Sequence, residues 1–313
     1  MKATPTHTMQ ARFGRSVGPA VVGILYFVLA MASLLLTRGG EGIATMWPPS
    51  GLLLAVLLLR STNRAMAYVV PAAVASVAAN FLVGAAFVTS IGFTIANMTE
   101  SLIGIWLLRQ QPGYRLSFVD PAGLWRFVGV ACGIAALSAT LATLLGPAAN
   151  LSFFVSWFST DLLGILIVTP MIVIGAELYP REARSDLGFN RTEVVAVLGG
   201  VAVVATITFS QSSYPLLFVP MATVILAVFR LGPFGATTGV LIIAVISSLA
   251  AGRETGPTVL IGGPPETRIF FVQFYLVTLL ASSMPTAALL SIRRRLLRQL
   301  SESNRELDRV VAP

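Results

Sequence analysis

The chain has 313 residues, of which 56% are hydrophobic and 11% are charged, and its mean hydropathy is +0.84. Soluble domains carry about 25% charged residues, so this composition excludes a soluble globular protein and indicates a polytopic membrane protein. The net charge of +8 does not indicate a nucleic-acid-binding protein, because the basic residues lie in short clusters between apolar segments. Cys132 is the single cysteine, so the chain has no internal disulfide.

The apolar segments predict an all-α integral membrane bundle of about ten transmembrane helices. Eight remains the alternative, because the two short helices around Leu231-Gly232-Pro233 are the weakest assignment. We expect residues 1–16 to form an N-terminal tail, 17–292 the transmembrane domain and 293–313 a linker helix. The predicted helices are 17–37, the segment from Trp47 through LLLAVLLLR, 65–84, 90–109, 124–145, 151–176, 193–209, 214–230, 233–251 and 268–292.

The distribution of basic residues predicts the orientation of this bundle. With the N-terminus inside, all but three of the 21 Lys and Arg residues fall in cytoplasmic segments, the exceptions being Arg38, Arg253 and Arg268. Since Lys and Arg are concentrated on the cytoplasmic side of membrane proteins, we expect both termini to face the cytoplasm.

Two acidic residues lie deep in predicted helices. Glu100 is near the middle of segment 90–109, three residues after Asn97 and therefore on the same helical face, and Asp161 is near the middle of segment 151–176. A carboxyl at that depth costs about 2.5–3.5 kcal/mol on insertion scales, so each must face protein or trapped water and find a partner. We expect a ligand-binding or sensing site here, for a cationic or proton-carrying ligand. Interhelical hydrogen bonding that only fixes the bundle is the alternative.

Further candidate site residues lie on neighbouring segments. Trp47, Pro48, Pro49 and Ser50 open an apolar helix, where proline is tolerated in the first turn and tryptophan is favoured at the membrane interface. Asn80 lies near the end of the next segment. We expect these residues toward the outer face, lining a pocket that opens outward. Helix initiation, interfacial anchoring and packing are the alternatives.

Pro170 predicts a kink in segment 151–176, since proline removes an intrahelical hydrogen bond, and a kink can serve as a hinge. Beyond the last predicted span, the spacing of Leu296, Leu300, Leu307 and Val310 resembles a heptad seam. This spacing favours a signal-relay helix continuous with the last span, and the alternative is a solvated basic tail.

These motifs together resemble the first type of bacterial membrane-associated sensor domain (the MASE family). They occur in order along successive predicted helices: Trp47-Pro48-Pro49-Ser50-Gly51, Asn80, Asn97-x-x-Glu100, Asp161-x-x-Gly164 and Thr169-Pro170. The resemblance implies an input module of the bacterial inner membrane. Such modules are followed by PAS, diguanylate cyclase, phosphodiesterase or histidine-kinase domains. No such output domain is recognisable before Pro313, so we expect either a fragment of a longer sensor or a module with a separate partner, and the stop within a heptad pattern favours a fragment.

Three classes of function remain at this point. The first is a sensory module that relays a stimulus to a cytoplasmic output, c-di-GMP turnover or a histidine kinase, encoded in cis or in trans. Signalling through the heptad segment would imply a homodimer. The second is a secondary transporter or channel with an intramembrane acidic site. The third, an intramembrane enzyme, is disfavoured because no catalytic residues, metal ligands or cofactor motif are recognisable, and we expect no cofactor and no nucleic-acid partner.

Overall fold

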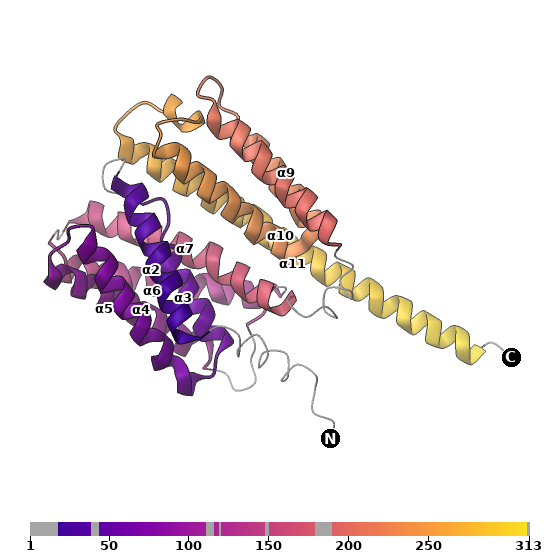
Figure 1. Ribbon diagram of the computed structural model, residues 1–313. Coiled ribbons are helices and arrows are strands. Elements are labelled where there is room, and N and C mark those ends of the chain that lie inside the picture. Colours follow the sequence, from indigo (N-terminus) through magenta and orange to yellow (C-terminus); the bar gives the residue numbers. More distant parts are fainter. Residues whose placement is uncertain are drawn as a thin grey trace.

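The computed structural model describes residues 18–38, 44–110, 116–118, 120–147, 150–178 and 190–311, and the expected tail at residues 1–16 lies outside this part of the chain. Every regular element in the described part is helical, which confirms the all-α prediction (Figure 1). The elements are α2 (Pro19–Arg38), α3 (Pro48–Leu59), η1 (Thr62–Arg64), α4 (Ala65–Leu82), α5 (Phe87–Leu108), α6 (Pro121–Leu145), α7 (Leu151–Leu178), α9 (Arg191–Ser210), α10 (Phe218–Ala251), η2 (Pro257–Leu260) and α11 (Pro265–Val311).

Eight helices of the described residues are long and apolar enough to cross a bilayer, and one of these eight, α10, consists of two arms that are described below. Large apolar side chains on the outside of the bundle are exposed, among them Val74 at 65% and Val88 at 77%. A soluble protein rarely exposes such surface, so these side chains are suited to contact with lipid.

The helices form two groups that share α7. In the first group, α2, α4 and α5 pack against α3, and α3 and α6 pack against α7. In the second group, α9 and α11 pack against α10, beside the first group (Figure 1). Helix α7 contacts members of both groups, α3 and α6 on one side and α10 and α11 on the other. A rearrangement around α7 can therefore reach both groups.

The segment that opens at Trp47 is a short helix and not a complete span. Helix α3 has 12 residues, which extend about 18 Å, whereas a bilayer core is about 30 Å thick. The prediction of a spanning helix here is corrected, because the apolar run gave no sign that the helix starts inside the bundle.

Helix α10 is a helical hairpin, with its two arms joined at Gly232. Gly232 has φ 59° and ψ −143°, which interrupts the helix. A β-carbon at Gly239 would lie 3.5 Å from Val224, whereas a straight helix separates residues fifteen positions apart by about 22 Å. The two arms therefore lie antiparallel, and they correspond to the predicted helices 214–230 and 233–251.

Arginines of both groups gather at one end of the bundle, which we call the arginine end: Arg60, Arg109, Arg126, Arg230 and Arg294. In the first group, Arg109 hydrogen-bonds the carbonyls that end α3, and Arg126 donates to Leu107. Gly175, near the carboxyl end of α7, lies beside Phe234, just after the turn of α10. The turn of α10 therefore lies at the same end of the bundle as the carboxyl end of α7. Residues 211–217 and 252–264 lie at the opposite end.

Candidate functional site

Helix α3 begins within the bundle, against α7. The Trp47 amide donates to the Thr160 carbonyl at 2.9 Å, about two and a half turns after α7 starts at Leu151, and Trp47 is only 8% exposed. Trp47 is therefore packed within the bundle. Pro48 and Pro49 occupy the first turn of α3, where their missing N–H groups cost little.

Glycines bring the backbones of α3 and α7 into direct contact. A β-carbon on Gly51 would overlap the carbonyl of Gly164, and one on Gly164 would overlap the carbonyl of Trp47. The Thr169 hydroxyl donates to the Gly51 carbonyl at 3.0 Å. These contacts fix the position and direction of the first turn of α3, which carries Ser50.

Ser50 lies between the two predicted carboxyl groups. Its Oγ is 2.8 Å from Glu100 Oε2 on α5 and 3.4 Å from Asp161 Oδ1 on α7. Glu100 is 0% exposed and Asp161 is 2% exposed, so both are buried as expected. We call Glu100 and Asp161 the acid pair. Because a hydroxyl has one proton, Ser50 donates to only one of the two carboxyls at a time.

Asp161 has additional support that the sequence analysis missed. The Ser138 hydroxyl on α6 donates to Asp161 Oδ2 at 2.8 Å, and Trp157 Nε1 on α7 donates to Ser138 Oγ at 3.0 Å. Asp161 Oδ2 therefore accepts a hydrogen bond whether or not Ser50 donates to Oδ1. Serines are common in transmembrane helices, so the sequence offered no specific signal for Ser138.

Among the described residues, no cationic side chain contacts the acid pair. In the part of the chain that the structure describes, no Lys or Arg hydrogen-bonds or ion-pairs with either carboxyl. The start of α3 supplies a partial positive charge through the helix dipole. If both carboxyls were ionised they would repel each other strongly, because water is excluded from them. A positive charge placed between them, either a proton or a small cation, would relieve this repulsion.

Several buried polar atoms near Glu100 lack hydrogen-bond partners among the described residues. They are both amide atoms of Asn97, Glu100 Oε1 and Ser101 Oγ. Asn97, Glu100 and Ser101 lie on one face of α5, because they are three and four residues apart. Buried polar groups are nearly always hydrogen-bonded to protein, water or an ion. This group of atoms therefore offers oxygen ligands and hydrogen-bond donors to a small bound species.

The other end of α3 is held by the same helix that carries Glu100. Arg109, directly after α5, donates from Nη2 to the Leu57 and Leu58 carbonyls at 2.8 and 3.0 Å and also to the Arg60 carbonyl. A cation at a helix C-terminus is favourable. Partial burial lowers the pKa of Arg109 from its ordinary value. Helix α5 thus contacts both ends of α3, Glu100 at its start and Arg109 at its end.

Gln273 connects α11 to the neighbourhood of the acid pair. Its Nε2 donates to the Ala44 and Thr45 carbonyls at 3.1 and 3.3 Å, and it lies 3.3 Å from Thr160 Oγ1. Its Oε1 accepts a 2.8 Å hydrogen bond from the Ser159 hydroxyl. Gln273 is 3% exposed, and it hydrogen-bonds Thr160, the residue directly before Asp161 of the acid pair. A lone amide in an apolar span was a signal that the sequence analysis did not use.

The remaining candidates are separate from the acid pair. Asn80 is buried, and its side-chain amide donates to the Ser76 carbonyl of its own helix at 2.9 Å. Pro170 is buried within a continuous α7. Leu296 and Leu300 are 54% and 61% exposed on α11. The side chains of Leu307 and Val310 lie outside the described residues.

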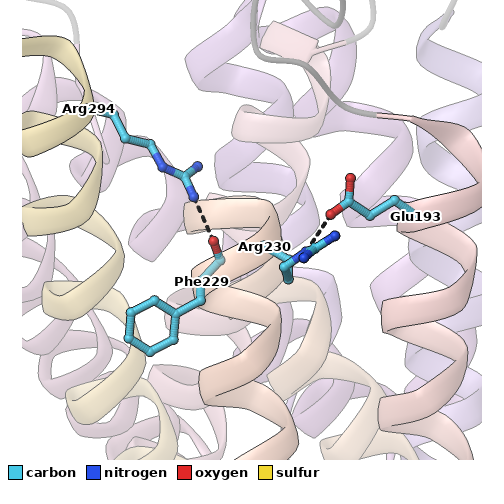
Figure 2. Close-up of polar contacts among 4 residues, drawn as sticks. All are labelled: Glu193, Phe229, Arg230 and Arg294. Atoms are coloured by element: carbon cyan, nitrogen blue, oxygen red, sulfur yellow. Dashed lines mark hydrogen bonds and ion pairs between the residues drawn. The ribbon is translucent and has the colours of Figure 1, made fainter. Parts of the chain in front are cut away.

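Helix α11 is fastened to α10 where it leaves the arginine end (Figure 2). Arg294 Nη2 donates to the Phe229 carbonyl at 2.6 Å, and the next residue of α10, Arg230, pairs with Glu193 of α9 at 2.6 Å. Beyond this point α11 extends away from the bundle (Figure 1). The helix therefore runs without interruption from Gln273, near the acid pair, to the exposed seam leucines.

A cavity of about 390 Å³ lies at the opposite end of the bundle, between α2, the segment 44–48, α10, η2 and α11. Of the residues predicted for the outward-opening pocket, Pro48 alone lines this cavity. The acid pair lies behind Pro48, and its carboxyls are not in the cavity wall.

Comparison with known proteins supports the resemblance noted from the motifs. No curated protein and no solved structure matches the chain. The family model MASE1 matches residues 20–295, which include every helix that contributes to the acid pair and most of α11. The chain therefore belongs to the MASE1 family of membrane-associated sensor domains.

Proposed function

We propose that the protein is a sensory input module of the bacterial inner membrane, and that the acid pair binds a proton or a small monovalent cation as part of the stimulus response. The observation that carries this proposal is the Ser50 hydroxyl held between two buried carboxyls from different helices. Intramembrane carboxyls are costly, and their usual roles are in binding or proton handling.

The geometry suggests how binding would be relayed. A positive charge between the carboxyls lets Glu100 and Asp161 approach each other, whereas without that charge they repel. Movement of Ser50, in the first turn of α3, displaces the segment 44–47, whose Ala44 carbonyl is bonded to Gln273. Movement of Asp161 displaces the preceding Thr160, which contacts both Trp47 and Gln273. The ligand shifts the equilibrium only by its difference in affinity between the two arrangements.

In this proposal α11 carries the change to a cytoplasmic output, a c-di-GMP enzyme or a histidine kinase encoded in cis or in trans. The arginine end faces the cytoplasm, as the bias of basic residues favours. The exposed Leu296 and Leu300 pair with a second copy of the chain, which makes the module a homodimer. Any catalytic chemistry belongs to the output protein.

The test uses spin labels on the purified chain in lipid nanodiscs. Labels at Ser61→Cys and Ser303→Cys, both exposed, report the distance between the end of α3 and the outer part of α11 in a Cys132→Ala background. We expect the distance to shift by about 1–2 Å as pH or sodium concentration is changed at constant ionic strength. Glu100→Gln with Asp161→Asn should abolish the shift while the protein remains folded.

An equal shift in the doubly neutralised protein would falsify the role of the acid pair. A constant distance in the parent protein under all conditions would remove the relay to α11. Labels at Ser61→Cys and Thr140→Cys provide the control, because the exposed Thr140 on α6 is not part of the connection through Gln273.

One observation also favours a second candidate, a cation transporter. Transporters use discontinuous helices whose N-termini lie near the membrane midplane at the substrate site, and α3 starts within the bundle beside the acid pair. Flux assays in proteoliposomes separate the two functions. We expect no sodium-coupled or proton flux above that of empty liposomes, and a flux abolished by Glu100→Gln would favour the transporter.

A further inference from the structure

The cavity at the opposite end of the bundle has an apolar wall with two charged side chains. Leu29 of α2, Met46 of the segment 44–48 and Val245 of α10 contribute apolar surface, and Glu254 and Arg268 contribute opposite charges. A volume of about 390 Å³ lies within the range of small-molecule sites, which are mostly apolar with a few polar groups that fix orientation.

The two charged side chains do not neutralise each other. Neither Glu254 nor Arg268 forms an ion pair within the described part of the chain. Arg268 donates from Nε to the Ile261 carbonyl at 3.4 Å, and this hydrogen bond leaves both terminal nitrogens of the guanidinium group for a ligand. A carboxylate and a guanidinium that line one cavity without meeting can each contact one end of a ligand with both charges.

The backbone holds Glu254 in an unusual conformation. Its φ is 53°, the one positive φ of a non-glycine residue in the described chain. L-residues other than glycine and asparagine rarely adopt this conformation, and such outliers occur preferentially at functional sites. Gly252, two residues earlier, lines the same cavity, so the turn that presents Glu254 is part of its wall.

We propose that this cavity binds a small zwitterion with an apolar body, its ammonium group at Glu254 and its anionic group at Arg268. A free apolar amino acid and the head group of an ethanolamine phospholipid share this chemistry, and the experiment below separates them. The proposal is independent of cation binding by the acid pair.

An occupant of the cavity also contacts two segments that Gln273 joins. Met46 and Pro48 belong to the segment that leads into Ser50, and Arg268 and Ile269 lie about one turn before Gln273 on α11. A ligand held between them restrains α11 against the start of α3. The cavity is thereby a second input to the same helix.

Thermal unfolding of the delipidated chain in detergent, followed by tryptophan fluorescence, tests the proposal. The probes are L-leucine, 4-methylpentanoate, which lacks the amine, 3-methylbutylamine, which lacks the carboxylate, and dihexanoylphosphatidylethanolamine. Leucine is expected to raise the unfolding temperature saturably by about 2–4 °C, while the two singly charged analogues leave it unchanged. Stabilisation by the phospholipid alone supports the zwitterion chemistry and identifies the source as lipid.

Matched substitutions identify the cavity as the site. Glu254→Gln and Arg268→Gln should each weaken binding of the stabilising zwitterion by about tenfold or more. Glu266→Gln and Arg253→Gln, at charged residues that do not line the cavity, should leave the affinity unchanged. No stabilisation by either zwitterion, equal stabilisation by a singly charged analogue, or equal binding by all four variants overturns the proposal.

Discussion

The acid pair and the end cavity use charge in opposite ways. The acid pair holds two carboxyl groups close together around the Ser50 hydroxyl, with almost no exposure to solvent. The cavity holds two unlike charges, Glu254 and Arg268, that do not pair with each other. A single positive charge complements the first arrangement, whereas a molecule with both charges complements the second.

This difference also determines how much change in geometry each site tolerates. Two buried carboxyls are tolerated only in a fixed geometry, because each must keep its hydrogen bonds without access to water. The charged groups of the cavity can be solvated and need no such support. We therefore expect substitutions near the acid pair to affect folding as well as response, and substitutions in the cavity to affect binding alone.

The largest effect is expected from Gly164→Ala. The new β-carbon would overlap the Trp47 carbonyl, a backbone atom that cannot move aside without displacing α3. We expect a loss of about 3 kcal/mol in stability or failure to fold, measured by thermal unfolding in detergent. Gly129→Ala on α6 is the control, since no atom lies within 4 Å of its β-carbon position. Equal stability of the two variants would show that the contact between α3 and α7 is not tight.

Removal of the hydroxyl between the carboxyls is expected to have the next largest effect. Ser50→Ala removes the hydroxyl that donates to Glu100 at 2.8 Å, and we expect a cost of about 1–3 kcal/mol in thermal unfolding. The cost should be smaller in a Glu100→Gln background, because the amide removes one charge and can itself donate to Asp161. If the two costs are equal, Ser50 does not couple the carboxyls.

Much of this arrangement could be predicted from the sequence, because the apolar segments and the rare acids within them are strong signals. Each of the ten predicted segments is helical in the structure, and Glu100 and Asp161 are buried as expected. The positions of Asn97 and Glu100 on one face of α5 followed from their spacing alone.

The start of α3 could not be predicted, since its depth depends on tertiary contacts. The run after Trp47 is as apolar as a spanning helix, but the Trp47 amide is bonded to Thr160 of α7 and Gly51 packs on Gly164. The supporting role of Ser138 was likewise hidden, because nothing local distinguishes it from other serines. Backbone contacts between helices distant in sequence leave no pattern in one chain.

Substitution of Gln273 tests whether the two sites act on the same helix. Gln273→Leu removes the hydrogen bonds from α11 to Ala44 and Thr45, with an expected cost of about 1–2 kcal/mol. We also expect it to abolish the shift in distance between labels at Ser61→Cys and Ser303→Cys. Thr278→Val on α11 is the control, because the Thr278 hydroxyl bonds its own helix. A shift that persists in Gln273→Leu would require another route to α11.

The smallest effect on folding, and a specific effect on assembly, is expected at the outer part of α11. Leu296 and Leu300 are 54% and 61% exposed, and their spacing places them on the predicted seam. Leu300→Glu should shift the chain from dimer toward monomer in light scattering of the purified protein, because a charge at a seam position must be desolvated in the dimer. The unfolding temperature should not change, since Leu300 makes no contact with the bundle core.

Leu297→Glu provides the matched control for this assembly test. Leu297 is 56% exposed, close to the exposure of Leu300, but it lies one position beyond Leu296 and off the seam. If Leu297→Glu and Leu300→Glu weaken the dimer equally, hydrophobic surface in general holds the copies together. If only Leu300→Glu does so, the two copies meet along the predicted seam, and a displacement of α11 at Gln273 reaches the partner helix in a defined register.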